Sequence, residues 1–233
     1  MGKRFFVKTE NQSLAKDFFL VDSEHHHLAN VMRLRVGDEL VIVCGDEFDY
    51  FYKIVSITKN STGLEFVKRV VNQCNPKEKL TVYISLIKFD NLVTAITKLS
   101  EIGVSDVVLF NSDYSNIATK SVNILKLEKI LEQSCKQCER SIPIKLRGVM
   151  SFAEMLKDLP GNVVFADETK RDEKLSFAGV DAVVIGPEGG FSGQERDALG
   201  IVAKPISLGR RVLRTETAAI VASTLILSKK GEI

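Results

Sequence analysis

The sequence has no run of about 18 apolar residues, so no segment of it is expected to span a membrane. The first six residues, Met1–Phe6, contain no apolar core of the length that a signal peptide needs, and the expected location is therefore the cytoplasm. Hydrophobic residues make up 45% of the chain and charged residues 27%. These proportions are typical of a folded globular protein and exclude a disordered one.

Cysteine and histidine are scarce, with four and three copies. Cys135 and Cys138 form a C-x-x-C pair, but Cys44 and Cys74 stand alone, so the second pair of a zinc site is missing. All three histidines are consecutive, His25–His27, and are interpreted as a polar helix start with one ring turned inward. No metal is expected, and no Ser-His-Asp or Cys-His arrangement supports a hydrolase.

The chain also lacks a strong charge imbalance. Its formal net charge is +2, and residues 1–75 contain ten basic and ten acidic side chains. The overall charge therefore neither requires nor excludes nucleic acid. A surface for RNA would have to come from local clusters of basic residues.

Two regions with different patterns are present, and we expect domains at 1–72 and 76–233. The first region is β-rich, with strands expected at 4–8, 39–44, 48–58 and 64–71 and a short helix at 24–32. A polar segment with one proline, residues 73–77, is expected to link the two domains. The second region alternates strands with helices, which predicts an α/β fold whose parallel sheet is covered on both faces. Its strands are expected at 80–87, 107–110, 144–149, 162–166, 181–185 and 204–208, and its helices from 90 to 103, 122 to 140, after 151, and 216 to 228.

One glycine-rich turn follows a buried strand in the second region. The apolar run 183–185 leads into Gly186-Pro187-Glu188-Gly189-Gly190, and Ser192-x-x-Glu195 then has the pattern of a capping box that begins a helix. The turn lacks the G-x-G-x-x-G spacing of a dinucleotide site and the Gly-Lys-Ser/Thr of a phosphate loop. Glu188 would repel a phosphate. A neutral or cationic ligand suits this loop better, and a plain strand-to-helix turn is the alternative.

A second turn of the same kind lies at 207–219. A short apolar run reaches Leu208-Gly209, and another helix begins near Glu216. The turn between them carries Arg210, Arg211 and Arg214, with the hydroxyl groups of Thr215 and Thr217 close behind. In a parallel sheet, ligands bind at the carboxyl ends of the strands, which is where both turns are expected.

Together the two turns resemble the cofactor-binding motifs of SPOUT methyltransferases, and most closely the family that methylates N3 of a uridine in 16S ribosomal RNA. The strings GPEGG and LG..(I/V)LR.ETA of that family stand here as 186–190 and 208–218. The resemblance extends over nearly the whole chain, through RFF near the start, 26–40, 98–104 and 136–143. The chain departs from the family at Asp113-Tyr114-Ser115, where the family usually has an arginine, and this puts one RNA contact in doubt.

The resemblance implies a PUA-like β-barrel that binds RNA, followed by a SPOUT α/β domain with a C-terminal trefoil knot. It also implies a homodimer, S-adenosylmethionine as cofactor, and 16S ribosomal RNA or the assembled small ribosomal subunit as partner. Glycines in the two turns would let backbone groups contact the adenine. The expected cofactor-binding residues are Ala166, Glu168, Gly186, Pro187, Glu188, Gly189, Gly190, Leu208, Gly209, Leu213, Thr215 and Thr217.

The proton on uridine N3 must leave before or during methyl transfer, so the reaction needs a base or a group that stabilises the deprotonated ring. Arg211, Arg214 and Glu216 are the expected catalytic residues, and we favour an arginine over a dedicated base. Two alternatives remain open: a 2′-O-ribose methyltransferase of the same superfamily, and a non-catalytic RNA-binding protein.

Contacts with RNA are expected from polar and basic side chains outside the two turns. Arg33 and Arg35 flank Leu34 and could contact a phosphate or lie on a solvated face. Gln137 and Arg140 share the polar face of the 122–140 helix, opposite an apolar stripe that includes Cys135 and Cys138. The full set expected to contact RNA is Arg4, Arg33, Arg35, Lys98, Gln137 and Arg140.

Overall fold

The computed structural model describes residues 3–8, 14–115, 117, 119, 122–170 and 177–233. Its internal contacts divide the chain into two units, which are described separately. The first unit comprises residues 1–75 with 132–143, and the second comprises 76–131 with 144–233. The expected domain bounds, 1–72 and 76–233, remain a prediction.

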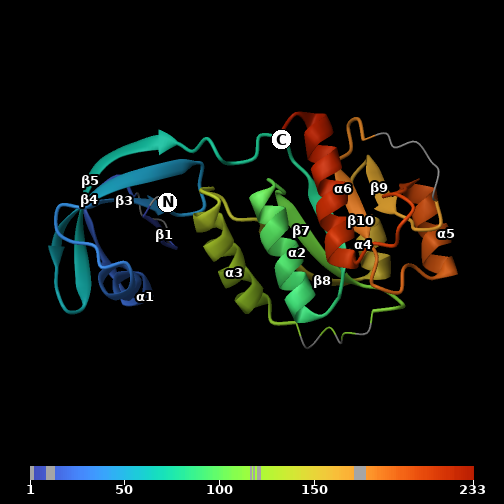
Figure 1. Ribbon diagram of the computed structural model, residues 1–233, viewed down its shortest axis with the longest axis horizontal. Coiled ribbons are helices and arrows are strands. Elements are labelled where there is room, and N and C mark those ends of the chain that lie inside the picture. Colours follow the sequence, from blue (N-terminus) through green and yellow to red (C-terminus); the bar gives the residue numbers. More distant parts are fainter. Residues whose placement is uncertain (1–2, 9–13, 116, 118, 120–121, 171–176) are drawn as a thin grey trace. The chain divides into compact units, whose positions relative to one another are not determined.

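The first unit is built on one curled five-stranded sheet with the order β1-β3-β4-β5-β2 (Figure 1). The pair β1–β3 is parallel and the other pairs are antiparallel. A short helix and a π-helical turn connect β2 to β3. The bounds are β1 (Arg4–Phe6), β2 (Phe18–Val21), α1 (Asp22–His26), η1 (His27–Val31), β3 (Glu39–Val43), β4 (Phe48–Ile57) and β5 (Ser61–Val71). This is the barrel-like unit expected from the sequence, which did not reveal β2.

Alternating residues of these strands form the core of the first unit. Leu40 and Ile42 of β3 and Tyr52 and Ile54 of β4 point inward, and each is at most 2% exposed. His25 is also buried, and its two ring nitrogens lie 2.8 Å from Thr62 Oγ1 and 3.2 Å from the Lys59 carbonyl. The interpretation of one histidine turned inward is confirmed, and no cluster that could hold a metal ion occurs among the described residues.

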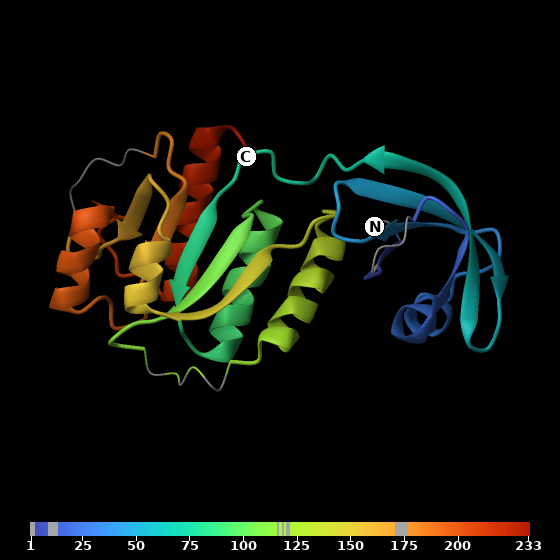
Figure 2. The same ribbon diagram turned by 180° about the vertical axis from the view of Figure 1, so that it is seen from behind.

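The second unit contains a six-stranded parallel sheet with the order β11-β9-β10-β6-β7-β8 (Figure 2). The chain therefore returns to the middle of the sheet when β10 enters between β9 and β6. The strands are β6 (Thr81–Ser85), β7 (Asp106–Asn111), β8 (Lys145–Ser151), β9 (Val163–Ala166), β10 (Ala182–Ile185) and β11 (Lys204–Ile206). The helices are α2 (Phe89–Glu101), α3 (Ile124–Gln137), α4 (Phe152–Asp158), α5 (Gly193–Val202) and α6 (Thr215–Lys230).

Helices cover both faces of this sheet, as expected because its strands are apolar on both sides. Val183 and Ile185 of β10 pack with α2 and α6, whereas Val184 points to the opposite face, where α4 and α5 lie. The predicted α/β organisation is confirmed. The trefoil knot stays a prediction from the resemblance. Among the described residues, no helix is long and apolar enough to cross a membrane.

Among the element ends that differ from the sequence prediction, two lie beside residues that were expected to be functional. The helix expected at 122–140 ends at Gln137, and Glu139 has a φ of +65°, a left-handed conformation that cannot continue a helix. The strand expected at 204–208 ends at Ile206. Ser207 and Leu208 therefore belong to the loop that follows β11.

Candidate active site

A cavity opens in the second unit where β9, β10 and β11 end. The volume of this cavity is about 70 Å³. The chain segments that follow the three strands supply its walls, as expected for a ligand site in a parallel sheet. It is lined by Ala166, Asp167, Glu168, Ile185, Gly186, Pro187, Gly190, Phe191, Leu208, Gly209, Arg211, Leu213, Thr215 and Ala218.

Two glycines of the loop after β10 lie close to neighbouring side chains. Gly190 has a φ of +71°, and its N–H donates to the Pro187 carbonyl at 2.9 Å, which closes a tight turn. A Cβ at this position would lie 2.7 Å from Glu168 Oε1. A Cβ on Gly186 would lie 3.1 Å from the Phe191 ring. At Gly190 the positive φ favours glycine, and at Gly186 a larger residue would require the Phe191 ring to shift.

The loop after β11 is joined to the first loop by a hydrogen bond. Gly209 adopts a φ of +107°, and its N–H donates to Ser207 Oγ at 3.2 Å. Thr215, the first residue of α6, is only 3% exposed, and its hydroxyl donates to the Gly186 carbonyl at 3.1 Å. The second loop therefore holds the first in position, and the two glycine turns form a single site.

Acidic residues after β9 form a third wall of the cavity. Asp167 accepts hydrogen bonds from the Thr169 amide and hydroxyl through Oδ1, and the Arg196 guanidinium lies 3.4 Å from the same oxygen. Arg196 also donates to Glu168 Oε1 at 3.1 Å. The other oxygen, Asp167 Oδ2, is buried and has no hydrogen-bond partner among the described residues. A buried acceptor in this state is costly unless a ligand donates to it.

The three expected catalytic residues differ in their relation to the cavity. Arg211 lines it and is exposed to solvent. Arg214 is exposed and precedes α6, where its carbonyl accepts from the Ala218 amide at 2.8 Å. Glu216 is half-buried in the first turn of α6, and its Oε2 is buried without a partner among the described residues. Of the three, the geometry brings only Arg211 to the cavity wall.

Most of the residues expected to bind cofactor meet at this cavity. Ala166, Glu168, Gly186, Pro187, Gly190, Leu208, Gly209, Leu213 and Thr215 line it. Glu188, Gly189 and Thr217 are exposed and do not. Asp167, which belongs to the same acidic turn as Ala166 and Glu168, also lines the cavity. Sequence reasoning missed Ile185, Phe191 and Ala218, and the Phe191 ring packs close to Gly186 in a way that no spacing indicates.

A polar network fixes the loop after β7 next to the first glycine loop. Glu195 of α5 is 3% exposed and accepts hydrogen bonds from Ser112 Oγ, the Asp113 amide and the Ser192 amide at 2.9–3.0 Å. Ser192 Oγ in turn donates to Asp113 Oδ2 at 2.6 Å. Asp113-Tyr114-Ser115, the segment that departs from the family pattern, is therefore held against the start of α5.

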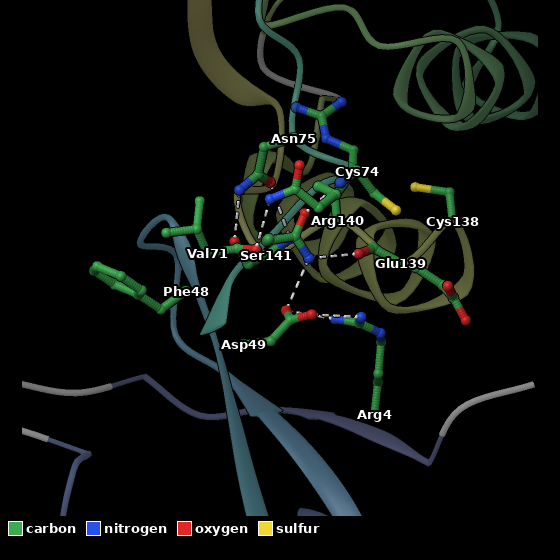
Figure 3. A network of polar contacts seen from close by, with 12 residues as sticks. Arg4, Phe48, Asp49, Val71, Cys74, Asn75, Cys138, Glu139, Arg140 and Ser141 are labelled. Carbon is green, nitrogen blue, oxygen red and sulfur yellow. Dashed lines mark hydrogen bonds and ion pairs between the residues drawn. The ribbon is translucent and has the colours of Figure 1, made fainter. Parts of the chain in front are cut away.

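The residues expected to contact RNA include two that are engaged inside the first unit. Arg4 donates to both carboxylate oxygens of Asp49 at 2.7–2.8 Å (Figure 3). The Asn72 amide group donates both to Asp49 and to the Glu139 carbonyl. Burial lowers the pKa of Arg4, but its hydrogen bonds and attraction to Asp49 outweigh this and leave the pKa raised. Arg140 is only 2% exposed. This geometry favours a structural role for both arginines.

The other residues expected to contact RNA lie at the surface. Arg33 and Arg35 are exposed on either side of the buried Leu34, and Arg33 adopts a φ of +54°. Gln137 is exposed at the end of α3. Lys98 is about half exposed and pairs with Glu101 at 2.8 Å. Contact of these residues with RNA stays a prediction.

A parallel sheet with two interlocked glycine loops and an acidic wall at its carboxyl edge defines an α/β protein that binds a small polar ligand. Comparison with known proteins then specifies the family. Residues 73–227 match the RNA methyltransferase domain family, and residues 22–62 match the RNA methyltransferase PUA domain family.

Relatives with assigned functions agree with these matches. The chain is 28% identical to ribosomal RNA small subunit methyltransferase E of Rickettsia conorii, over 94% of this chain and 92% of the relative. It is 32% identical to the enzyme of the same name from Helicobacter pylori strain 26695, over 77% and 80% of the two chains. A crystal structure of ribosomal RNA small subunit methyltransferase E from Neisseria gonorrhoeae, bound to S-adenosyl methionine, has the same fold, with a TM-score of 0.88 over 98% of each chain and 21% identity. This chain belongs to the ribosomal RNA small subunit methyltransferase E family of RNA methyltransferases.

Proposed function

We propose that the protein transfers a methyl group from S-adenosylmethionine to N3 of a specific uridine in 16S ribosomal RNA of the small ribosomal subunit. Family membership supports the reaction class and the type of RNA. The observation that carries the cofactor assignment is the cavity itself, which is lined by two glycine loops and by Asp167, whose buried Oδ2 has no hydrogen-bond partner in the described part of the chain. A ligand that brings hydrogen-bond donors and positive charge fits this wall.

The chemistry of the cavity suits S-adenosylmethionine better than a nucleotide phosphate. When bound, the cofactor supplies an activated methyl group on a cationic sulfonium, together with an amino group and ribose hydroxyls that donate hydrogen bonds. Asp167 and Glu168 present negative charge to the cavity, and Arg196 holds both carboxylates in place. These carboxylates would repel a phosphate, and they attract a cation.

Arg211 is the residue we assign to the uridine. Loss of the N3 proton spreads negative charge onto the two ring carbonyl oxygens, and a guanidinium fork can receive that charge with paired hydrogen bonds. Arg211 lines the cavity and is exposed to solvent, so the nucleic acid can reach it. Methyl transfer is then largely a matter of positioning, because N3 must lie in line with the methyl group.

The 2′-O-ribose alternative needs a positioned base for a hydroxyl of much lower acidity. The ionisable residues of the cavity wall are Asp167, Glu168 and Arg211, and Arg196 pairs with both carboxylates. Both carboxylates already pair with Arg196, and the remaining ionisable group is the Arg211 guanidinium, which attracts an anion. The wall therefore favours stabilisation of a uridine anion over deprotonation of a ribose.

The product distinguishes the two reactions. Ribosomal RNA would be incubated with the protein and cofactor, and the methylated position mapped by reverse transcription. Methylation at N3 blocks Watson–Crick pairing and stops the transcriptase. A product that is read through and resists alkaline cleavage would establish the 2′-O-ribose reaction instead, and unmodified RNA despite bound cofactor would leave the non-catalytic alternative.

We further propose that the protein acts as a homodimer in the cytoplasm, on free 16S ribosomal RNA or on the assembled subunit. Apolar side chains exposed on the second loop and on α6 support a second copy: Val212 in the loop is 75% exposed, and Leu225 on the helix is 38% exposed. The mass in solution, measured by light scattering, is expected to be twice that of the chain, and Leu225→Glu to halve it. Methylation assays on naked RNA and on assembled subunits would identify the preferred substrate.

A further inference from the structure

Tyr114 is the most exposed aromatic side chain in the described part of the second unit, with 50% of its surface accessible. It follows β7, so it lies at the same edge of the sheet as the cavity. It also touches the first glycine loop. A Cβ placed on Gly189 would lie 3.1 Å from Tyr114 Cβ and 3.6 Å from the Cγ and Cδ2 atoms of its ring. Gly189 is followed by Gly190, which lines the cavity.

The backbone that carries this side chain is held on both sides. Before Tyr114, the Asp113 amide donates to Glu195 Oε1 and the Asp113 carboxylate accepts from Ser192 Oγ. After it, the Ser115 amide donates to the Ser112 carbonyl at 2.9 Å, and the Ser115 hydroxyl lies 2.7 Å from that of Ser85. Because its backbone is fixed by these hydrogen bonds, Tyr114 loses little conformational entropy when another molecule packs on its ring.

Exposure of half of the Tyr114 surface costs hydrophobic burial, and no described residue covers that exposed part. Single-stranded RNA bases are recognised by stacking on aromatic rings of this kind. Aliphatic partners would also bury the ring, but the family's substrate is RNA, and a flat ring next to the cofactor loop matches a flat base.

We propose that Tyr114 stacks on the target uridine or its immediate neighbour and positions it at the mouth of the cavity. This inference rests on the proposed function. The family usually has an arginine in this segment, which would contact RNA through its charge. In this chain the Tyr114 ring makes an RNA contact by stacking instead. Tyr114 is a positioning residue, because it holds the base by stacking and exchanges neither a proton nor the methyl group with it.

Steady-state methylation kinetics on 16S ribosomal RNA test this role. Tyr114→Ala is expected to lower kcat/KM for RNA by about tenfold or more, in line with the ~1–3 kcal/mol that stacking contributes per base. Tyr114→Phe keeps the ring and is expected to stay within about twofold of the parent. Affinity for S-adenosylmethionine, measured by calorimetry without RNA, is expected to be the same in all three proteins. Ile201→Ala, which removes another exposed apolar side chain, is the matched control.

A structural role would give different results. If Tyr114 only supports Gly189, then Tyr114→Ala would weaken cofactor affinity as well, and this outcome would overturn the proposal. Equal kinetics for Tyr114→Ala and the parent would overturn it too.

Photocrosslinking gives a readout that does not depend on turnover. The probe is 16S ribosomal RNA transcribed with 5-iodouridine, which couples to an aromatic side chain in stacking contact when irradiated. The proposal expects Tyr114 in a crosslinked peptide, and loss of that peptide in Tyr114→Ala. Crosslinks elsewhere but not at Tyr114 would contradict it. If the crosslink forms but no N3 methylation occurs, the stacking role stands and the proposed function fails.

Discussion

Single residues of the cavity take conformations and contacts that few side chains allow. Gly190 combines a positive φ with a carboxylate oxygen 2.7 Å from the place of a Cβ, whereas Gly209 has a positive φ and open space around it. A substitution at Gly190 therefore introduces both a steric conflict and backbone strain, whereas one at Gly209 introduces backbone strain alone. Asp167 combines burial with an acceptor oxygen that no described group satisfies.

Replacement of Gly190 by valine is expected to abolish measurable binding of S-adenosylmethionine in a folded protein. The side chain would strain the turn and push Glu168 out of the cavity wall. Gly209→Ala meets strain alone and should weaken binding less. Gly200→Ala on α5 has no atom within 4 Å of its Cβ and serves as the control. Calorimetry checks the affinities, and unchanged affinity in folded Gly190→Val would contradict the assignment of the cavity.

Asp167→Asn tests the unpartnered oxygen. The change keeps the shape of the side chain but removes its charge, so we expect affinity for S-adenosylmethionine to fall by about tenfold, in line with a hydrogen bond to a charged group. Asp197→Asn removes an exposed carboxylate from α5 and should leave the affinity unchanged. If both variants bind as the parent does, Asp167 Oδ2 does not face the cofactor.

Glycine positions of this site could be predicted from the sequence, because their spacing and neighbours follow the strand–turn–helix pattern directly. The role of Asp167 could not, since its environment depends on Arg196, which comes from a helix later in the chain. The same holds for Arg4 and Arg140. Their charge indicated RNA contact, but only the folded unit shows Asp49 beside Arg4 and the burial of Arg140.

At the scale of elements, two helices begin with the same capping box in different environments. Ser151 and Glu154 cap α4 at the surface, whereas Ser192 and Glu195 cap α5 in the interior. The Ser-x-x-Glu pattern at Ser192 was visible in the sequence and predicted the helix start correctly. It did not show that Glu195 also holds the loop after β7, because that contact joins segments about 80 residues apart.

Glu195→Ala is expected to lower the free energy of unfolding by about 2–4 kcal/mol, because it leaves the Ser112 hydroxyl and two amides without their acceptor in a buried site. Glu154→Ala removes an exposed capping box and should cost less. Urea denaturation of both variants measures the difference. Equal losses would mean that Glu195 acts only as a helix cap and does not fix the loop that carries Tyr114.

Across the whole molecule, buried phenol groups link stability to alkaline pH. Burial and hydrogen bonds to aspartates raise the pKa of Tyr50 and Tyr83 to about 12. Burial also raises the pKa of Tyr52. The folded protein therefore favours the neutral form of these phenols more strongly than the unfolded chain does, because tyrosine in an unfolded chain has a pKa of ~10. Their contribution is complete below that pH and is lost as the pH rises through about 12.

Phenolate absorbance and circular dichroism, followed together against pH, check this linkage. We expect most phenol ionisation to coincide with loss of structure above pH ~10. Tyr83→Phe removes one of the three groups and should make stability less sensitive to alkali. Free titration of these phenols near their ordinary pKa in a folded protein would contradict the prediction.

The position of β10 has a consequence for how the chain is made. Ala182 of β10 pairs with Thr81 of β6, although β7 and β8 have joined the other side of β6 much earlier in the chain. During synthesis, one edge of an apolar strand therefore stays unpaired until most of the polypeptide has left the ribosome. Such an edge can pair with other chains, and strands that lie this far apart in the sequence pair slowly. Because β10 leads into the first glycine loop, the methylation site can form only after all strands of the sheet have paired.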